Sequence, residues 1–145
     1  MSDSRTPSHL ALPRLLLVDT QAGFRFTIGD YFRRLGVAVD EAASISEAEA
    51  WLAKGAYGVV LTDLQLSARH EGEGIALARR VRSAAPTTAV CILTVPSEPR
   101  LMQAAASVAN VVLTRPRKLA DIAQVVFALL HDPAATAFTS TGAYS

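Results

Sequence analysis

Short apolar runs alternate along this chain with segments whose apolar residues recur at helical spacing. The runs carry no alternation of polar and apolar residues, so each is typical of a strand buried on both faces of a sheet. These predicted strands cover residues 15–18, 37–39, 58–61, 90–93 and 111–113.

The segments between the runs predict amphipathic helices. In the first of them, four apolar residues form one stripe at positions i, i+4, i+8 and i+11: Phe24, Ile28, Phe32 and Leu35. The sequence SISE at residues 44–47 is a capping box, which predicts the start of the second helix. Three further helices are expected around residues 75–81, 98–108 and 119–130. Strands and helices that alternate in this way predict a doubly wound α/β fold, with five parallel strands and five covering helices.

The ends of the chain lack this periodicity. Residues 1–12 are polar and predict a flexible N-terminal arm, and residues 132–145 are small and polar and predict a disordered tail. One domain over residues 13–131 lies between them.

The composition of the chain limits the kinds of molecule that it is expected to bind. The chain has 145 residues, 50% of them hydrophobic, and a net charge of +1, so neither nucleic acid nor a membrane surface is indicated. No segment has the length of a membrane span or the form of a secretory signal, and we expect a soluble, cytoplasmic protein. The only cysteine, Cys91, lies in a buried run. The histidines share no metal-ligand spacing: His9, His70 and His131.

Polar residues follow four of the predicted strands. They are two carboxylates, a hydroxyl and a cation: Asp19, Asp63, Thr94 and Arg115. In a doubly wound sheet the carboxyl ends of the strands form the ligand site, next to the point where the strand order reverses. Each residue alone is more typical of a helix cap or a surface salt bridge. Together they indicate a functional site.

These residues and the sequences around them resemble the receiver domain of bacterial two-component response regulators, the CheY-like family. The resemblance covers about residues 12–131 and implies the flavodoxin-like, or CheY-like, fold. The matching sequences are LLLVDT at 15–20, VVLTDLQL at 59–66, EGIALARRVR at 73–82, CILT at 91–94 and LTRP at 113–116. The third of these matches the helix that follows an Asp-Gly turn in the family.

The resemblance implies a role for each strand-end residue. Asp63 corresponds to the aspartate that accepts a phosphoryl group from a histidine kinase, and Asp19 and Asp63 correspond to carboxylates that bind Mg²⁺. Thr94 matches the switch hydroxyl that bonds the phosphate. Arg115 stands in place of the family's lysine, and the family implies a cis peptide bond before Pro116.

Several residues depart from the family pattern. Thr20 replaces the second acid of an adjacent pair, which is usually the direct metal ligand. Arg115 is planar and forked, unlike lysine, and has the reach to pair with Asp63 or Asp19 itself. Val95 stands where a small residue leaves room for phosphate, and Val112 where an aromatic partners the hydroxyl. The loop at residues 64–74 is longer than usual and lacks Met-Pro. We therefore expect weak Mg²⁺ binding, no resident cofactor, and weak or absent phosphorylation.

The last predicted helix offers a partner surface. Between residues 119 and 130 only Asp121 and Gln124 are polar, so apolar side chains remain outside the core. The residues expected to lie wholly or partly outward are Val125, Phe127 and Ala128. In receivers this region is the customary dimer and target surface, which agrees with a homodimer here.

The sequence thus favours a stand-alone, atypical receiver that is not an enzyme and acts through protein–protein interaction. Its partners would be a histidine kinase and a downstream target. One alternative is a conventional switch phosphorylated on Asp63. Another, from a different class, is a small doubly wound hydrolase, although Asp63-Leu64-Gln65 lacks the second acid of an Asp-x-Asp motif.

Overall fold

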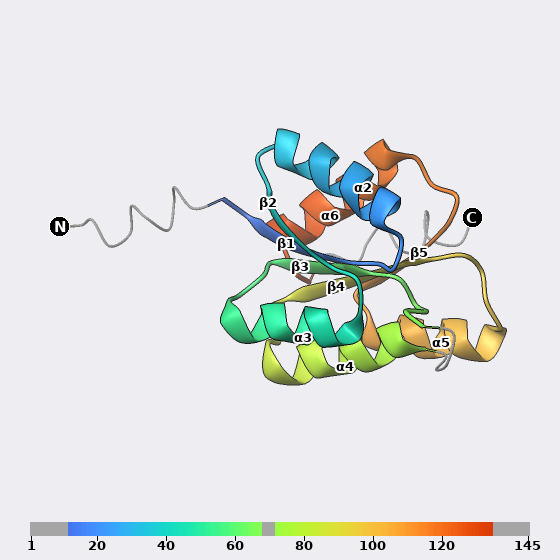
Figure 1. The fold of residues 1–145 in the computed structure, drawn as a ribbon. Coiled ribbons are helices and arrows are strands. Elements are labelled where there is room, and N and C mark those ends of the chain that lie inside the picture. Colours follow the sequence, from blue (N-terminus) through green and yellow to red (C-terminus); the bar gives the residue numbers. More distant parts are fainter. Residues whose placement is uncertain (1–11, 68–71, 135–145) are drawn as a thin grey trace.

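The computed structural model describes residues 12–67 and 72–134. Within them lies one five-stranded parallel sheet in the order β2-β1-β3-β4-β5, as the sequence predicts (Figure 1). The strands are β1 (Arg14–Val18), β2 (Ala38–Ala42), β3 (Val59–Thr62), β4 (Ala89–Thr94) and β5 (Val111–Thr114). The strand order reverses between β1 and β3, so this edge of the sheet is where a ligand site is expected.

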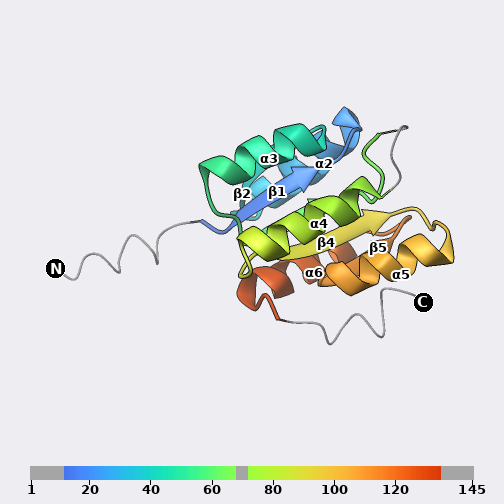
Figure 2. The ribbon, with the colours of Figure 1, turned by 90° about the horizontal axis from the view of Figure 1, so that it is seen from below.

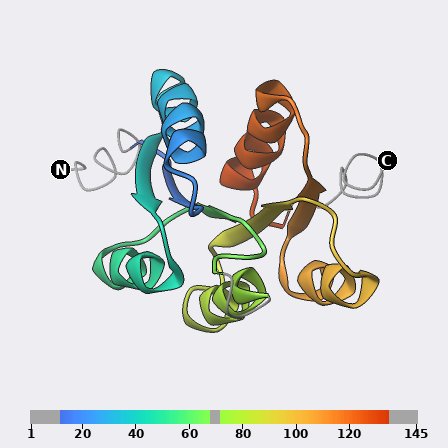
Figure 3. The same ribbon diagram turned by 45° about the vertical axis from the view of Figure 1, so that its right-hand side comes forward.

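Helices cover both faces of the sheet. They are α2 (Ala22–Arg34), α3 (Ile45–Lys54), α4 (Glu73–Ala84), α5 (Pro99–Val108) and α6 (Leu119–His131). Figure 3 shows α2 and α6 on one face and α3, α4 and α5 on the other, and Figure 2 shows the second face from below. Among the described helices, none is long and apolar enough to span a bilayer.

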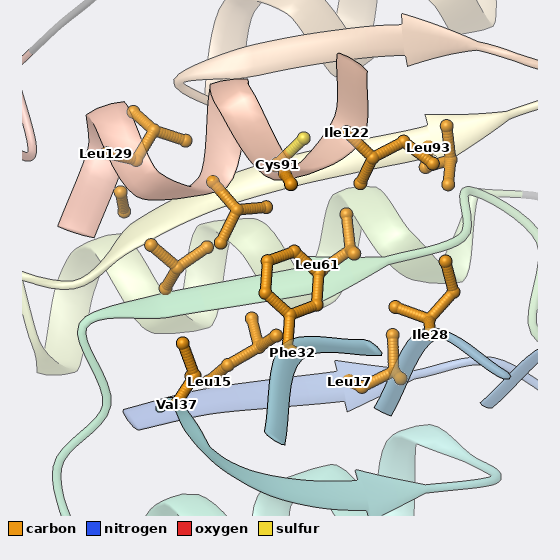
Figure 4. Close-up of a cluster of buried hydrophobic side chains, with 14 of the residues drawn as sticks. Leu15, Leu17, Ile28, Phe32, Val37, Leu61, Cys91, Leu93, Ile122 and Leu129 are labelled. Carbon is orange, nitrogen blue, oxygen red and sulfur yellow. The ribbon is translucent and has the colours of Figure 1, made fainter. Parts of the chain in front are cut away.

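The core has two halves because successive residues of a strand point to opposite faces. Leu15 and Leu17 belong to the cluster under α2 and α6, while Leu16 and Val18 belong to the cluster under the other helices. Phe32 lies at the centre of the first cluster (Figure 4). Cys91 is fully buried in that cluster, where burial raises the pKa of its thiol to about 12, so it is a core residue.

The predicted helix start at Ser44 is confirmed, but the Glu47 side chain binds the N–H of Ala43 and not that of the N-cap residue itself. Ser44 Oγ accepts a hydrogen bond from the backbone N–H of Glu47 at 3.1 Å, and Glu47 Oε1 accepts one from the Ala43 N–H at 2.7 Å. One member of the predicted stripe on the first helix is wrong. Leu35 lies just beyond the end of α2 and is 51% exposed. Helical spacing does not apply past the last turn, so the stripe ends at Phe32.

The second strand is longer than predicted, and it runs through two acids. It lies at the edge of the sheet, where a strand does not need to be apolar throughout. Asp40 is held there by Arg14 Nη2 at 2.9 Å and by the Tyr57 hydroxyl at 2.6 Å. Burial, and then this bond to Asp40, raise the pKa of Tyr57. The sequence pattern stops at residue 39 because it assumes a strand buried on both faces.

The predicted arm at residues 1–12 and the predicted tail at 132–145 fall almost wholly outside the described residues. So do His9, His70 and part of the long loop after Asp63. His131, which ends α6, is exposed.

Candidate functional site

Four polar residues meet at the carboxyl edge of the sheet. Asp19 follows β1, Asp63 follows β3, Thr94 ends β4 and Arg115 follows β5. The parallel register aligns these strand ends, with Val18 opposite Thr62 and Thr94 opposite Thr114.

Arg115 forms an ion pair across this edge. Its Nη2 donates to Asp19 Oδ2 at 2.6 Å and lies 3.6 Å from Asp63 Oδ2. The same nitrogen is 3.3 Å from the carbonyl oxygen of Leu93. One guanidinium nitrogen therefore lies between both carboxylates, with the shorter contact to Asp19. The sequence predicts a pairing with either acid, and the structure confirms it.

Asp19 is 1% exposed, so its charge is removed from water. Its Oδ1 accepts a hydrogen bond from the Gln21 N–H at 2.8 Å, and its carbonyl accepts one from Arg25 Nη1 at 2.6 Å. A buried carboxylate needs this degree of compensation, and a charge-assisted bond to arginine is the strongest kind available to it.

Asp63 is more accessible than Asp19. Its side chain is 22% exposed, and its Oδ1 accepts a hydrogen bond from the Leu64 N–H at 2.6 Å. Gly74, near the start of α4, packs against this turn and donates its N–H to the carbonyl of Leu64 at 2.8 Å. A Cβ at position 74 would collide with the Asp63 carbonyl oxygen and lie 2.9 Å from the Leu64 Cα.

The other candidate residues differ in how far they are exposed to solvent. Thr94 is 3% exposed, and its carbonyl accepts the Arg115 N–H at 2.8 Å. Thr20 is exposed beside Asp19, Val95 is 62% exposed directly after Thr94, and Val112 is 2% exposed within the core. The peptide bond between Arg115 and Pro116 is cis, as predicted.

The donor set does not fit a magnesium ion. Mg²⁺ requires near-octahedral oxygen ligands. Both carboxylate oxygens of Asp19 already accept hydrogen bonds, and Arg115 lies between Asp19 and Asp63. Within the described residues, no group of three or more His, Cys, Asp or Glu side chains could hold a metal ion. Arg115 thus occupies space between the two carboxylates.

The predicted partner surface on α6 is half-buried. Phe127 packs against Phe32 of α2, with ring centroids 5.8 Å apart, and Val125 also contacts the core cluster. Ala128 is half-buried as well. Of this set, Val125 and Ala128 are the better candidates for an outward contact, because Phe127 is already engaged in packing two helices together.

Two side chains of the site were not predicted from the sequence as site residues. Phe24, predicted only as a core residue, also lies under Arg115, with the guanidinium Cζ 4.3 Å from the ring centroid. Arg25 holds the backbone carbonyl of Asp19. Their position in the sequence could have indicated them, because both lie at the start of the helix that follows Asp19.

The sequence and the fold match one known family. A sequence model of the response regulator receiver domain matches residues 15–127. The chain belongs to this family, and its described fold is the family's five-stranded parallel sheet with five helices. A search of curated proteins finds no match.

Solved structures share the fold at low identity. A CheY-like receiver domain protein from Methanospirillum hungatei JF-1 is 19% identical, with 84% of this chain and 96% of that chain covered and a TM-score of 0.77. A two-component response regulator from Clostridium difficile is 19% identical, with 85% and 99% covered and a TM-score of 0.75. CheY4 of Vibrio cholerae is 21% identical, with 82% and 99% covered and a TM-score of 0.72. At these identities the likeness concerns the fold alone.

Proposed function

We propose that this receiver signals by binding other proteins and that its pocket is not used for ordinary phosphorylation. The observation that carries the proposal is the position of Arg115 Nη2, 2.6 Å from Asp19 Oδ2 and 3.6 Å from Asp63 Oδ2. The guanidinium lies where a metal and a phosphoryl group would have to be accommodated. The guanidinium pairs with Asp19 and also approaches Asp63, so a cation of the protein itself lies in the site.

Electrostatics supports the same conclusion. Phosphoryl transfer to a carboxylate brings negative groups together, so it depends on positive charge that screens them. Two carboxylates and one guanidinium leave one excess negative charge, whereas three acids and one lysine leave two. The site therefore attracts a divalent cation less strongly than a pocket with the full acid pair. Thr20 adds a hydroxyl but no charge.

Arg115 also gives the proposal a mechanism. Removing the guanidinium from Asp19 would leave a buried carboxylate whose remaining hydrogen-bond donor, within residues 12–67 and 72–134, is the Gln21 N–H. That cost disfavours any state in which Arg115 turns away to admit a ligand. The bridge thus holds the carboxyl edge in one conformation, which the protein can present to a partner without a phosphoryl signal.

The direct test incubates the protein with acetyl phosphate, or with beryllofluoride, in the presence of Mg²⁺. We expect little or no modification of Asp63 by intact-mass measurement and no change in the amide resonances around Thr94. Ready labelling of Asp63, together with tight Mg²⁺ binding, would establish the conventional switch in its place.

Three features favour that conventional switch as the second candidate. Asp63 is 22% exposed, its Oδ2 lies 3.6 Å from Arg115 Nη2, and Thr94 occupies the switch position. A phosphodonor could therefore reach the acceptor oxygen if Arg115 moved. The family match favours either signalling reading over a hydrolase.

We further propose that the receiver forms a homodimer through α6. Val125→Glu places a charge on the half-buried outer side of the helix, and we expect the dimer to weaken by about tenfold or more because an unpaired charge is costly inside an interface. Light scattering over a concentration series measures the change. Gln124→Glu, at an exposed position next to it, adds the same charge and should have little effect. A wild-type protein that is monomeric at every concentration would contradict the proposal.

A further inference from the structure

The guanidinium of Arg115 has a contact that hydrogen bonds and ion pairs do not describe. Its Cζ lies 4.3 Å from the centroid of the Phe24 ring, while Nη2 reaches Asp19 and the carbonyl of Leu93. Its Nε is buried and has no hydrogen-bond partner within the described part of the chain. Part of this cation is therefore desolvated without a polar partner. The ring is the group that offers compensation, since the face of an aromatic ring attracts a cation.

Phe24 is itself held in place by the core. It lies in the first turn of α2, is half-buried, and packs against the cluster that contains Ile28 and Phe32. The ring therefore does not depend on Arg115 for its position. A fixed ring beneath a long, flexible side chain is suited to select one of that side chain's conformations.

Two other residues at the start of α2 bind Asp19, the carboxylate with which Arg115 pairs. The Gln21 N–H binds the Asp19 carboxylate, and Arg25 binds the Asp19 carbonyl at 2.6 Å. The residues after β1 thus bind both the carboxylate and the carbonyl of Asp19, and Phe24 lies against the cation that pairs with this carboxylate. Both halves of the ion pair are anchored to one turn of one helix.

From these contacts we propose that Phe24 is a positioning residue for Arg115: its ring holds the guanidinium over Asp19 and keeps the phosphoryl and metal position closed. The role in closure rests on the proposed function above, whereas the positioning of Arg115 does not. Arg115 keeps 22% of its side-chain surface exposed, so an open route to solvent exists for it. With the ring removed, the contacts of Nη2 with Asp19 and with the Leu93 carbonyl would restrain one edge of the guanidinium and leave its plane free.

The first test measures how fast the guanidinium protons of Arg115 exchange with water, by nuclear magnetic resonance on labelled protein. In Phe24→Leu we expect exchange about fivefold faster, the factor that corresponds to a cation–π contact of ordinary strength. Phe24→Tyr keeps an aromatic face and should restore the slow exchange. Phe26→Leu is the matched control, because Phe26 lies on the same helix and is 67% exposed. Unchanged exchange in a folded Phe24→Leu protein would overturn the proposal.

The second test shows whether Phe24 acts through Arg115. Titration with Mg²⁺ alone should give about fivefold tighter binding in Phe24→Leu than in the wild type. In an Arg115→Gln background the same substitution should change nothing, because no cation remains to be held. Equal effects in both backgrounds would mean that Phe24 only supports the packing of α2, and would also overturn the proposal.

The exchange measurement involves neither metal nor phosphate. If wild-type Asp63 is labelled readily but Phe24→Leu still speeds exchange, the proposed function fails while the positioning role stands. If Asp63 is not labelled and Phe24→Leu leaves the exchange rate unchanged, the proposed function stands and the positioning role fails.

Discussion

Replacing Gly74 with alanine is expected to destabilise the protein by about 2–3 kcal/mol, the cost typical of forcing extra atoms into a closely packed position. The added Cβ would collide with the carbonyl oxygen of Asp63 and lie 2.9 Å from the Leu64 Cα. Both obstacles are backbone atoms, so no side chain can turn aside to relieve the contact. The start of α4 would have to move away from the turn that carries Asp63.

Urea denaturation measures this loss, and Gly23→Ala is the matched control. A Cβ on Gly23, in the first turn of α2, meets nothing within 4 Å, and alanine is the better helix former, so that variant should be as stable as the wild type or slightly more stable. Equal stability of the two alanine variants would show that α4 can shift without cost and that the close approach at Gly74 is not required.

The fold was predictable because its determinants are local. Strands buried on both faces are uniformly apolar, and the helices between them carry apolar residues at helical spacing. The spacing of apolar residues therefore suffices to predict the alternation of strands and helices. The prediction fell short where burial is incomplete. The edge strand β2 continues through Asp40 and Glu41, whose charges are met by arginines from elsewhere in the chain. Leu35 satisfied the helical spacing but lies beyond the helix end.

The site was predictable to the level of its residues but not of its contacts. Strand ends must meet at one edge of a parallel sheet, so Asp19, Asp63 and Arg115 could be placed together from sequence. Which acid the arginine prefers depends on burial, because Asp19 is 1% exposed and Asp63 retains access to water. Periodicity marked Phe24 as core, and its second contact depends on how the α2 start lies against the loop after β5.

Restoring the acid pair and the lysine together is expected to convert the protein into one that accepts phosphate. Thr20→Asp adds a carboxylate at an exposed position next to Asp19, and we expect Mg²⁺ binding to strengthen by about tenfold or more because Mg²⁺ depends on carboxylate oxygens. Arg115→Lys replaces the forked guanidinium by a compact charge that can serve Asp19 without spanning to Asp63. The double variant Thr20→Asp/Arg115→Lys should therefore be partly labelled on Asp63 by acetyl phosphate.

Intact-mass measurement after incubation with acetyl phosphate and Mg²⁺ gives the labelled fraction, and a Mg²⁺ titration gives the affinity separately. Thr27→Asp combined with Arg115→Lys is the control, because it adds the same charge at an exposed position further along α2. We expect this control to resemble Arg115→Lys alone. If the double variant binds Mg²⁺ tightly yet stays unlabelled, Arg115 is not the group that closes the pocket. If the labelled fraction instead rises only when Thr20→Asp and Arg115→Lys are combined, the missing acid and the bridging arginine act together. The first withholds a Mg²⁺ ligand, and the second lies where the phosphoryl group has to be accommodated at Asp63.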